Sequence, residues 1–182
     1  MTARITLVVG GCRSGKSAYA QRMAESLPPR RLFVATGAAT DDEMARRIAS
    51  HQLARRDRGW ETVEEPLDVA GVFGRQREHN VLVLDCVTLW VNNLMYAAGA
   101  QSHEIDEAEI AGRCREMLAA ARAATGTVIF VTSEVGMGIV PENASARRFR
   151  DLLGRANQQI AHEADAVTLL CCGIPLQIKD KG

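Results

Sequence analysis

Five short apolar runs, separated by segments long enough to form helices, constrain the fold of this chain more than any other feature. The runs are ITLVV (5–9), RLFVAT (31–36), NVLVLD (80–85), TVIFVT (127–132) and AVTLL (166–170). Continuous apolar runs of this length are typical of strands that are buried on both faces. Residues 16–27, 41–56, 87–99, 104–124 and 144–164 are predicted as helices. Because strands and helices alternate, we expect an α/β fold in which a mostly parallel sheet is flanked by helices.

Local signals refine these boundaries. Thr40 and Glu43 have the spacing of a capping box, which predicts that the second helix begins at about Asp41. Gly99 and Gly126 stand where helices are expected to stop. The segment CGIPLQIK (172–179) is predicted as an edge strand, since Pro175 cannot donate a hydrogen bond to an inner strand.

Composition limits the classes of function. The length of 182 residues suits a single domain, residues 1–182, and the net charge is zero, with 22 basic and 22 acidic side chains. No overall field would therefore attract nucleic acid or an anionic membrane. The 5 cysteines form no C-x-x-C pair, which argues against a disulfide framework or a zinc site and favours reduced thiols. We see neither a signal peptide nor an apolar run of membrane-spanning length, so we expect a cytoplasmic protein without a membrane span.

The segment VVGGCRSGKS (8–17) contains a phosphate-binding pattern. It matches G-x-x-x-x-G-K-S directly after a predicted strand and directly before a predicted helix, which is the context that the P-loop requires. In such a loop the backbone N–H groups face phosphate oxygens, the lysine lies over the β and γ phosphates, and the serine hydroxyl binds Mg²⁺. The candidate nucleotide-binding residues are Gly10, Gly11, Cys12, Arg13, Ser14, Gly15, Lys16 and Ser17.

Asp85 ends the run VLVLD, at the position from which a Walker-B carboxylate holds magnesium. Taken alone, an Asp at a strand end is often only a turn former or a helix cap. Together with the loop it predicts a site for a nucleoside triphosphate and Mg²⁺, with Ser17 and Asp85 as the metal-binding residues.

His51 is the other candidate for chemistry. Met44, Ile48 and His51 share one face of the predicted helix 41–56. Spacing alone favours a partly buried histidine on an amphipathic helix, so a nucleophilic role needs further support.

Several motifs together supply that support, because the chain resembles the bifunctional adenosylcobinamide kinase / adenosylcobinamide-phosphate guanylyltransferase family. The matching pieces occur in family order from residue 5 to about residue 178. They are GGCRSGKS, FVATG, DDEMARRIASHQ, RGWETVEEP, VLVLDCVTLWVNNL and VTSEVGMGIVPENASARRFRDLLGRANQQIA. We therefore expect a P-loop NTPase of RecA-like architecture.

The resemblance implies two reactions. ATP or GTP phosphorylates the hydroxyl of adenosylcobinamide, and GTP then transfers GMP to adenosylcobinamide phosphate with release of pyrophosphate. The second reaction of the family passes through a GMP-histidine, and the matching residue is His51, whose neutral imidazole is nucleophilic near pH 7. Some relatives have two adjacent histidines where this chain has Ser50 and His51, and some have Glu at Asp85. Both carboxylates are hard oxygen ligands, so we expect function to be retained.

Further contacts follow only from the resemblance. The residues implied to contact GTP are Ala35, Thr36, Gly37, Gln52, Leu53, Ala54, Arg55 and Glu64. A surface position is an equally good interpretation of Glu64. The segment SEVGMGIVPEN (133–143) is interpreted as a loop that lines the site or contacts another subunit, with Glu134 and Met137 as candidate corrinoid contacts, or as a purely structural loop. Asn143 is suited to cap the helix that follows.

The remaining expectations concern surfaces and alternatives. His79, His103 and His162 are interpreted as surface residues, and Trp60 and Trp90 as core or interface residues. The resemblance implies a homo-oligomer, specifically a trimer. Two other functions stay open from sequence: a P-loop kinase without a covalent intermediate, and a binding module controlled by a nucleotide.

Overall fold

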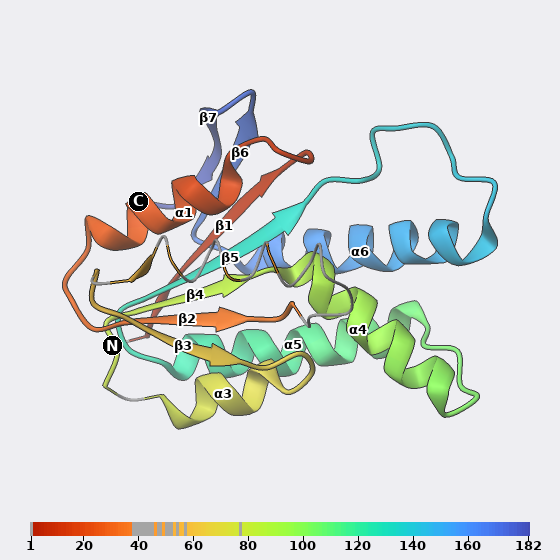
Figure 1. Ribbon diagram of the computed structural model, residues 1–182, viewed down its shortest axis with the longest axis horizontal. Coiled ribbons are helices and arrows are strands. Elements are labelled where there is room, and N and C mark those ends of the chain that lie inside the picture. Colours follow the sequence, from red (N-terminus) through yellow and green to blue (C-terminus); the bar gives the residue numbers. More distant parts are fainter. Residues whose placement is uncertain are drawn as a thin grey trace.

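The computed structural model describes residues 2–37, 46, 49, 53, 55–56, 58–76 and 78–182. Its centre is a sheet of seven strands in the order β3-β2-β4-β5-β1-β6-β7 (Figure 1). The strands are β1 (Arg4–Gly10), β2 (Arg31–Ala35), β3 (Trp60–Glu64), β4 (Val81–Asp85), β5 (Thr127–Ser133), β6 (Ala166–Cys171) and β7 (Ile174–Asp180). All neighbouring strands are parallel except β6 and β7, which form an antiparallel hairpin. The predicted α/β class and mostly parallel sheet are confirmed.

Helices cover both faces of the sheet. They are α1 (Lys16–Glu25), α3 (Val69–Arg75), α4 (Val87–Ala100), α5 (Glu107–Ala123) and α6 (Ala144–Glu163). Helix α1 packs on one face, and α3, α4, α5 and α6 pack on the other (Figure 1). Residues 46, 49, 53 and 55 are also helical, whereas the expected capping box at Thr40 and Glu43 lies outside the described residues.

The central strands are buried on both faces, as their apolar runs predict. In β4, Leu82 and Leu84 pack under the larger helical layer, while Val81 and Val83 pack under α1. The side chains of a strand alternate between the two faces, so an uninterrupted apolar run lets a strand contribute to both cores. This burial fixes the register of the strands whose carboxyl ends carry the candidate site.

Two elements were not predicted from sequence. Strand β3 has only partly buried and exposed residues, and it lies at the outer edge of the sheet beside β2. Helix α3 has 7 residues and is capped by Asp68, whose carboxylate accepts a hydrogen bond from Gly71 N. Residues 60–75, which form these two elements, contain neither a long apolar run nor a segment of typical helix length, and the other strands and helices were predicted from those two signals.

Other expectations differ in detail. The predicted helix 104–124 begins at Glu107, because Asp106 and Glu109 form a reciprocal capping box. This helix ends before Gly126, as expected, whereas α4 continues through Gly99 to Ala100. The expected edge strand is β7, and Asn143 caps α6 as predicted, accepting a hydrogen bond from Ala146 N at 3.0 Å.

The interpretation of His79 as a surface residue was wrong. Its side chain is buried, and its Nε2 lies 3.2 Å from Glu61 Oε2 of β3. His103 and His162 are exposed, as expected. Trp90 is buried and its indole N–H donates to Leu67 O at 2.9 Å, while Trp60 is partly buried and packs edge to face on Phe33. Among the helices that the structure describes, none has the length and apolar character needed to span a membrane.

Candidate active site

The phosphate-binding pattern forms the loop between β1 and α1, at the carboxyl edge of the sheet (Figure 1). Gly15 is the residue before α1 and has a φ of 89°, a left-handed conformation that glycine adopts without strain. Gly10 has no room for a side chain, because a Cβ there would lie 2.6 Å from Leu170 O. Lys16 Nζ donates to Gly11 O at 3.1 Å, so the lysine lies over the loop.

The β6–β7 turn supports this loop from the side. Gly173 N donates to Ser14 O at 3.0 Å, and Ser14 is buried. Cys12 and Arg13 lie on the exposed part of the loop. The loop is therefore fixed at its base, while its tip faces solvent, an arrangement suited to an incoming ligand.

Asp85 and Lys16 approach a common neighbour, Cys86. The pKa of the Cys86 thiol is raised to about 11, chiefly by burial and also by the Asp85 carboxylate, while the Lys16 ammonium acts in the opposite direction. The lysine at the start of α1 and the carboxylate at the end of β4 thus both act on the same thiol, although β1, which precedes α1, and β4 are not neighbouring strands. The serine hydroxyl at position 17 and the Asp85 carboxylate are hard oxygen donors, so the residues present fit the Mg²⁺ that the sequence predicts.

Thr36 links the end of β2 to the end of β4. It is completely buried, and its hydroxyl donates to Cys86 O at 2.7 Å and accepts from Cys86 N at 2.9 Å. Thr36 O accepts from Asn93 Nδ2 of α4 at 2.7 Å. Thr36 N donates to Asp85 O at 3.3 Å, so the side chain and the backbone of Thr36 are both engaged in joining β2, β4 and α4, and the structure leaves no exposed group of Thr36 for its predicted contact with GTP. Ala35 and Gly37 on either side are partly exposed.

The predicted GTP contacts beyond β2 are described only in part. His51, Gln52 and Ala54 lie outside the described residues, whereas Leu53 is exposed and Arg55 is buried. The Arg55 guanidinium lies 3.5 Å above the ring of Phe33 in β2. Burial lowers the pKa of Arg55, and the Asp85 carboxylate opposes that effect. Glu64 is exposed at the carboxyl end of β3.

Sequence reasoning missed the residues that hold the end of β5. Thr132 Oγ1 donates to Asn157 Oδ1 of α6 at 2.7 Å, and Asn157 Nδ2 donates to Ser133 O at 3.0 Å. Thr88 of α4 accepts from Ser133 N at 2.7 Å. Glu134 N then donates to Gly10 O of the phosphate loop at 3.1 Å. The phosphate-loop pattern and the carboxylate at the end of β4 do not point to Thr88 or Asn157; the only local signal is a polar residue on the side of the helix that packs on the sheet.

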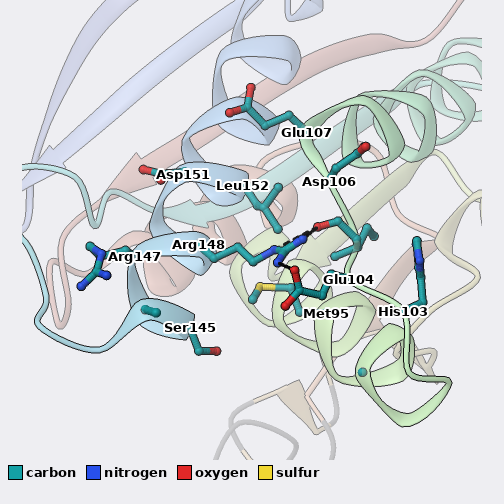
Figure 2. A pocket seen from close by; sticks show the side chains of 13 residues that line it. Met95, His103, Glu104, Asp106, Glu107, Ser145, Arg147, Arg148, Asp151 and Leu152 are labelled. Atoms are coloured by element: carbon teal, nitrogen blue, oxygen red, sulfur yellow. Dashed lines mark hydrogen bonds and ion pairs between the residues drawn. The ribbon is translucent and has the colours of Figure 1, made fainter.

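A larger groove of about 650 Å³ lies away from this edge, between α4, the α4–α5 connection and the first turns of α6. Figure 2 shows Arg148 at its centre, donating to Ile105 O at 2.8 Å and paired with Glu104. None of the predicted site residues that the structure describes lines it. Arg148 of α6 thus joins the two sides of this groove through its bonds to the α4–α5 connection, so its charge has a structural role there.

Comparison with known proteins decides the family. The model of the family described as "Cobinamide kinase / cobinamide phosphate guanyltransferase", CobU, matches residues 6–178. The chain belongs to this family. The match includes the phosphate loop, Asp85 and the 133–143 loop within one continuous alignment.

Curated CobU relatives support this membership. The bifunctional adenosylcobalamin biosynthesis proteins CobU of Salmonella typhimurium and of Escherichia coli are each 39% identical over 181 residues, covering 95% of this chain and 98% of theirs. The corresponding CobP of Pseudomonas aeruginosa is 37% identical over 174 residues, covering 95% and 96%.

Solved structures confirm the RecA-like architecture expected for a CobU chain. The RadB recombinase superposes with a TM-score of 0.51 at 14% identity, covering 91% of this chain and 73% of that one. An ATPase from a bacterial type III secretion system superposes with a TM-score of 0.60 at 12% identity, covering 92% and 51%. At such identities the likeness concerns the fold alone.

Proposed function

We propose that this chain phosphorylates adenosylcobinamide with ATP or GTP and then transfers GMP from GTP to adenosylcobinamide phosphate through a GMP-His51 intermediate. Cobinamide kinase and cobinamide phosphate guanylyltransferase are the two activities of its family. The observation that supports the proposal most strongly is that the phosphate loop with Lys16 follows β1 and Asp85 ends β4, which puts both at the carboxyl edge of the parallel sheet. A site of this kind binds the phosphates of a nucleoside triphosphate.

The phosphate loop has the same role in both reactions. Its backbone N–H groups and the N-terminus of α1 bind phosphate oxygens, and Lys16 exchanges its contact with Gly11 O for the β and γ phosphates. Ser17 and Asp85 would hold Mg²⁺, which would supply charge neutralisation at the transferred phosphates. Gly10, Gly11, Cys12, Arg13, Ser14 and Gly15 complete the loop.

The guanylyl transfer requires a nucleophile for the α-phosphorus. His51 is the residue of this chain that matches the family nucleophile; its imidazole attacks the α-phosphorus, pyrophosphate leaves, and the acceptor phosphate then displaces the histidine. We propose that Ala35, Gly37, Gln52, Leu53, Ala54, Arg55 and Glu64 contact GTP. The buried guanidinium of Arg55, which interacts with the Asp85 carboxylate, supports its proposed contact with GTP, because a buried arginine at a nucleotide site compensates phosphate charge.

The test is to incubate the protein and Mg²⁺ with GTP labelled at either the α or the γ phosphate, and to measure covalent label after denaturation. We expect α label alone, lost in acid and stable in base, as a phosphoramidate requires. His51→Ala abolishes the label, whereas the control His103→Ala, an exposed histidine paired with Glu109, retains it.

If neither label stays bound while GTP binding is intact, the covalent mechanism is refuted and a kinase without an intermediate remains. A homotrimer, proposed from the resemblance, is tested by sedimentation of the same preparation. A cytoplasmic location is proposed from the free thiols of its 5 cysteines, which suit a reducing compartment.

A further inference from the structure

A second groove, of about 350 Å³, lies beside the phosphate loop between the end of β5 and helix α6. Arg150, Gly154 and Asn157 of α6 line one side at helical spacing, and Glu134 with Val135 and Gly136 lines the other. Glu134 N is bonded to Gly10 O, the first residue of the loop, so the groove is adjacent to the bound phosphates expected there. The family's two reactions both require an acceptor molecule at this edge.

Side-chain hydrogen bonds from two helices hold the backbone directly before Glu134. Thr88 from α4 and Asn157 from α6 hold Ser133 from two sides, directly before Glu134. The Glu134 carboxylate is oriented in turn, since Oε1 accepts from Gly136 N at 2.5 Å. A Cβ at position 136 would lie 2.8 Å from Oε1, so a side chain there would displace this carboxylate from its present position. A carboxylate fixed in this way has the preorganisation that a catalytic group needs.

Arg150 gives the groove a cation opposite this carboxylate. Arg150 Nη1 is shielded from water, and it has no hydrogen-bond partner within the part of the chain that the structure describes. A buried guanidinium donor without a partner is costly, and an incoming anionic oxygen would satisfy it. The other charged groups lining the groove are Glu107, Asp151 and Arg155.

From this geometry we infer that the groove is the acceptor site, where Glu134 is the general base of the kinase reaction and Arg150 binds the phosphate that the reaction creates. The inference rests on the proposed function. The hydroxyl oxygen of the acceptor attacks the γ-phosphorus, its proton passes to a Glu134 carboxylate oxygen, and the bond from the γ-phosphorus to the bridging oxygen breaks. The electron pair leaves with the nucleoside diphosphate, and Glu134 then releases the proton to water.

The two residues act on different steps. A general base accelerates transfer from a hydroxyl, whereas the phosphate acceptor of the guanylyl transfer is already ionised near pH 7 and needs no base. Arg150 has a phosphate dianion to bind only after the first reaction. The inference therefore predicts that Glu134 determines the kinase rate and Arg150 the affinity for the phosphorylated acceptor.

The experiment compares purified Glu134→Gln with the wild type in three assays: phosphorylation of adenosylcobinamide, guanylylation of supplied adenosylcobinamide phosphate, and GTP binding. The glutamine retains the oxygen that accepts from Gly136 N. We expect the kinase kcat to fall by about 100-fold or more, the usual contribution of a general base, with the other two measurements within about twofold of wild type. Glu142→Gln, an exposed residue of the same loop, is the charge-matched control and retains kinase activity.

A parallel variant, Arg150→Met, tests the inferred role of Arg150 in binding the acceptor phosphate. Its KM for adenosylcobinamide phosphate is expected to rise about 10-fold, the scale of one lost charge-assisted hydrogen bond. Its KM for adenosylcobinamide and its thermal midpoint should change little. Arg113→Met, an exposed arginine of α5, is the control.

The outcomes separate this inference from the proposed function. If the wild type itself phosphorylates no adenosylcobinamide, the proposed function fails. If the wild type is active and folded Glu134→Gln retains more than half of its kinase kcat, Glu134 is not the base. An Arg150→Met variant with equal increases in both KM values would contradict the phosphate-binding role.

Discussion

Asp165 is expected to stabilise the edge of the sheet opposite the active site, by an amount that depends on pH. Its carboxylate accepts from Arg122 Nη1 at 2.5 Å, from Arg122 Nη2 at 2.9 Å and from Ile5 N at 2.7 Å. Hydrogen bonding to Arg122 is the main cause that lowers the pKa of Asp165 from 3.8 to about 2, against the opposing effect of burial. Such a difference in pKa corresponds to about 2 kcal/mol of folding free energy.

The sign follows from the lowered pKa. The contribution is complete above the unfolded pKa of 3.8 and is lost as the pH falls through the folded value of about 2. Urea unfolding of Asp165→Asn and wild type should therefore differ by about 2 kcal/mol at pH 7 and by about 1 kcal/mol at pH 3. Turnover at 25 °C should be unchanged, because the ion pair lies at the amino end of β1 and the phosphate loop at its carboxyl end.

The matched control is Asp180→Asn. Asp180 pairs with Arg4, but both side chains are about half exposed, at 53% and 41%. Exposed pairs contribute about 0–1 kcal/mol, so this variant should unfold close to wild type. A difference for Asp165→Asn that is below about 0.5 kcal/mol at pH 7, or that stays constant down to pH 3, would refute the linkage argument.

Three further substitutions test the site and its support. In Gly10→Ala the new Cβ would lie 2.6 Å from Leu170 O, so the phosphate loop must shift. Equilibrium titration should show that the affinity for GTP is lowered at least about 10-fold. An unchanged affinity would contradict the packing argument. Thr36→Val leaves the N–H and C=O groups of Cys86 without their hydroxyl partner, which should lower the free energy of urea unfolding by about 1–3 kcal/mol. An unchanged free energy of unfolding would mean that water replaces the hydroxyl. Trp90→Phe removes the hydrogen bond from the indole N–H to Leu67 O, and it should lower the free energy of urea unfolding by about 1–2 kcal/mol. A larger loss would indicate that the packing of the indole ring contributes more than the hydrogen bond.

The sequence predicted the parts of the fold that local physics determines. Each inner strand is an apolar run because it is buried on both faces, and the phosphate loop requires its glycines wherever it occurs. Strand β3 escaped prediction because WETVE lies at the edge, where Glu61 and Glu64 face solvent and leave no apolar run. His79 was misjudged because its side chain is buried only in the folded chain, where it meets Glu61, a residue from a different part of the sequence.

The order of the strands has no local signal, and the site depends on it. Thr88 and Asn157 lie on helices far apart in the sequence, and both reach Ser133 only because α4 and α6 pack on the same face of the sheet. The P-loop and Asp85 could be identified as motifs. The residues that hold Glu134 could not, since their role exists only after the helices have packed.

Strand β5 lies between β1, which ends in the phosphate loop, and β4, which ends in Asp85. A residue at the end of β5, such as Glu134, therefore lies between the strand that ends in the phosphate loop and the strand that ends in the carboxylate proposed to hold Mg²⁺. The two proposed roles concern different phosphorus atoms, because Glu134 would assist the attack of a hydroxyl on the γ-phosphorus, whereas His51 would attack the α-phosphorus. This division of roles would let one phosphate loop support two transfers. It also predicts that Glu134→Gln and His51→Ala lose different activities, and a variant of either that lost both while still binding GTP would refute the division.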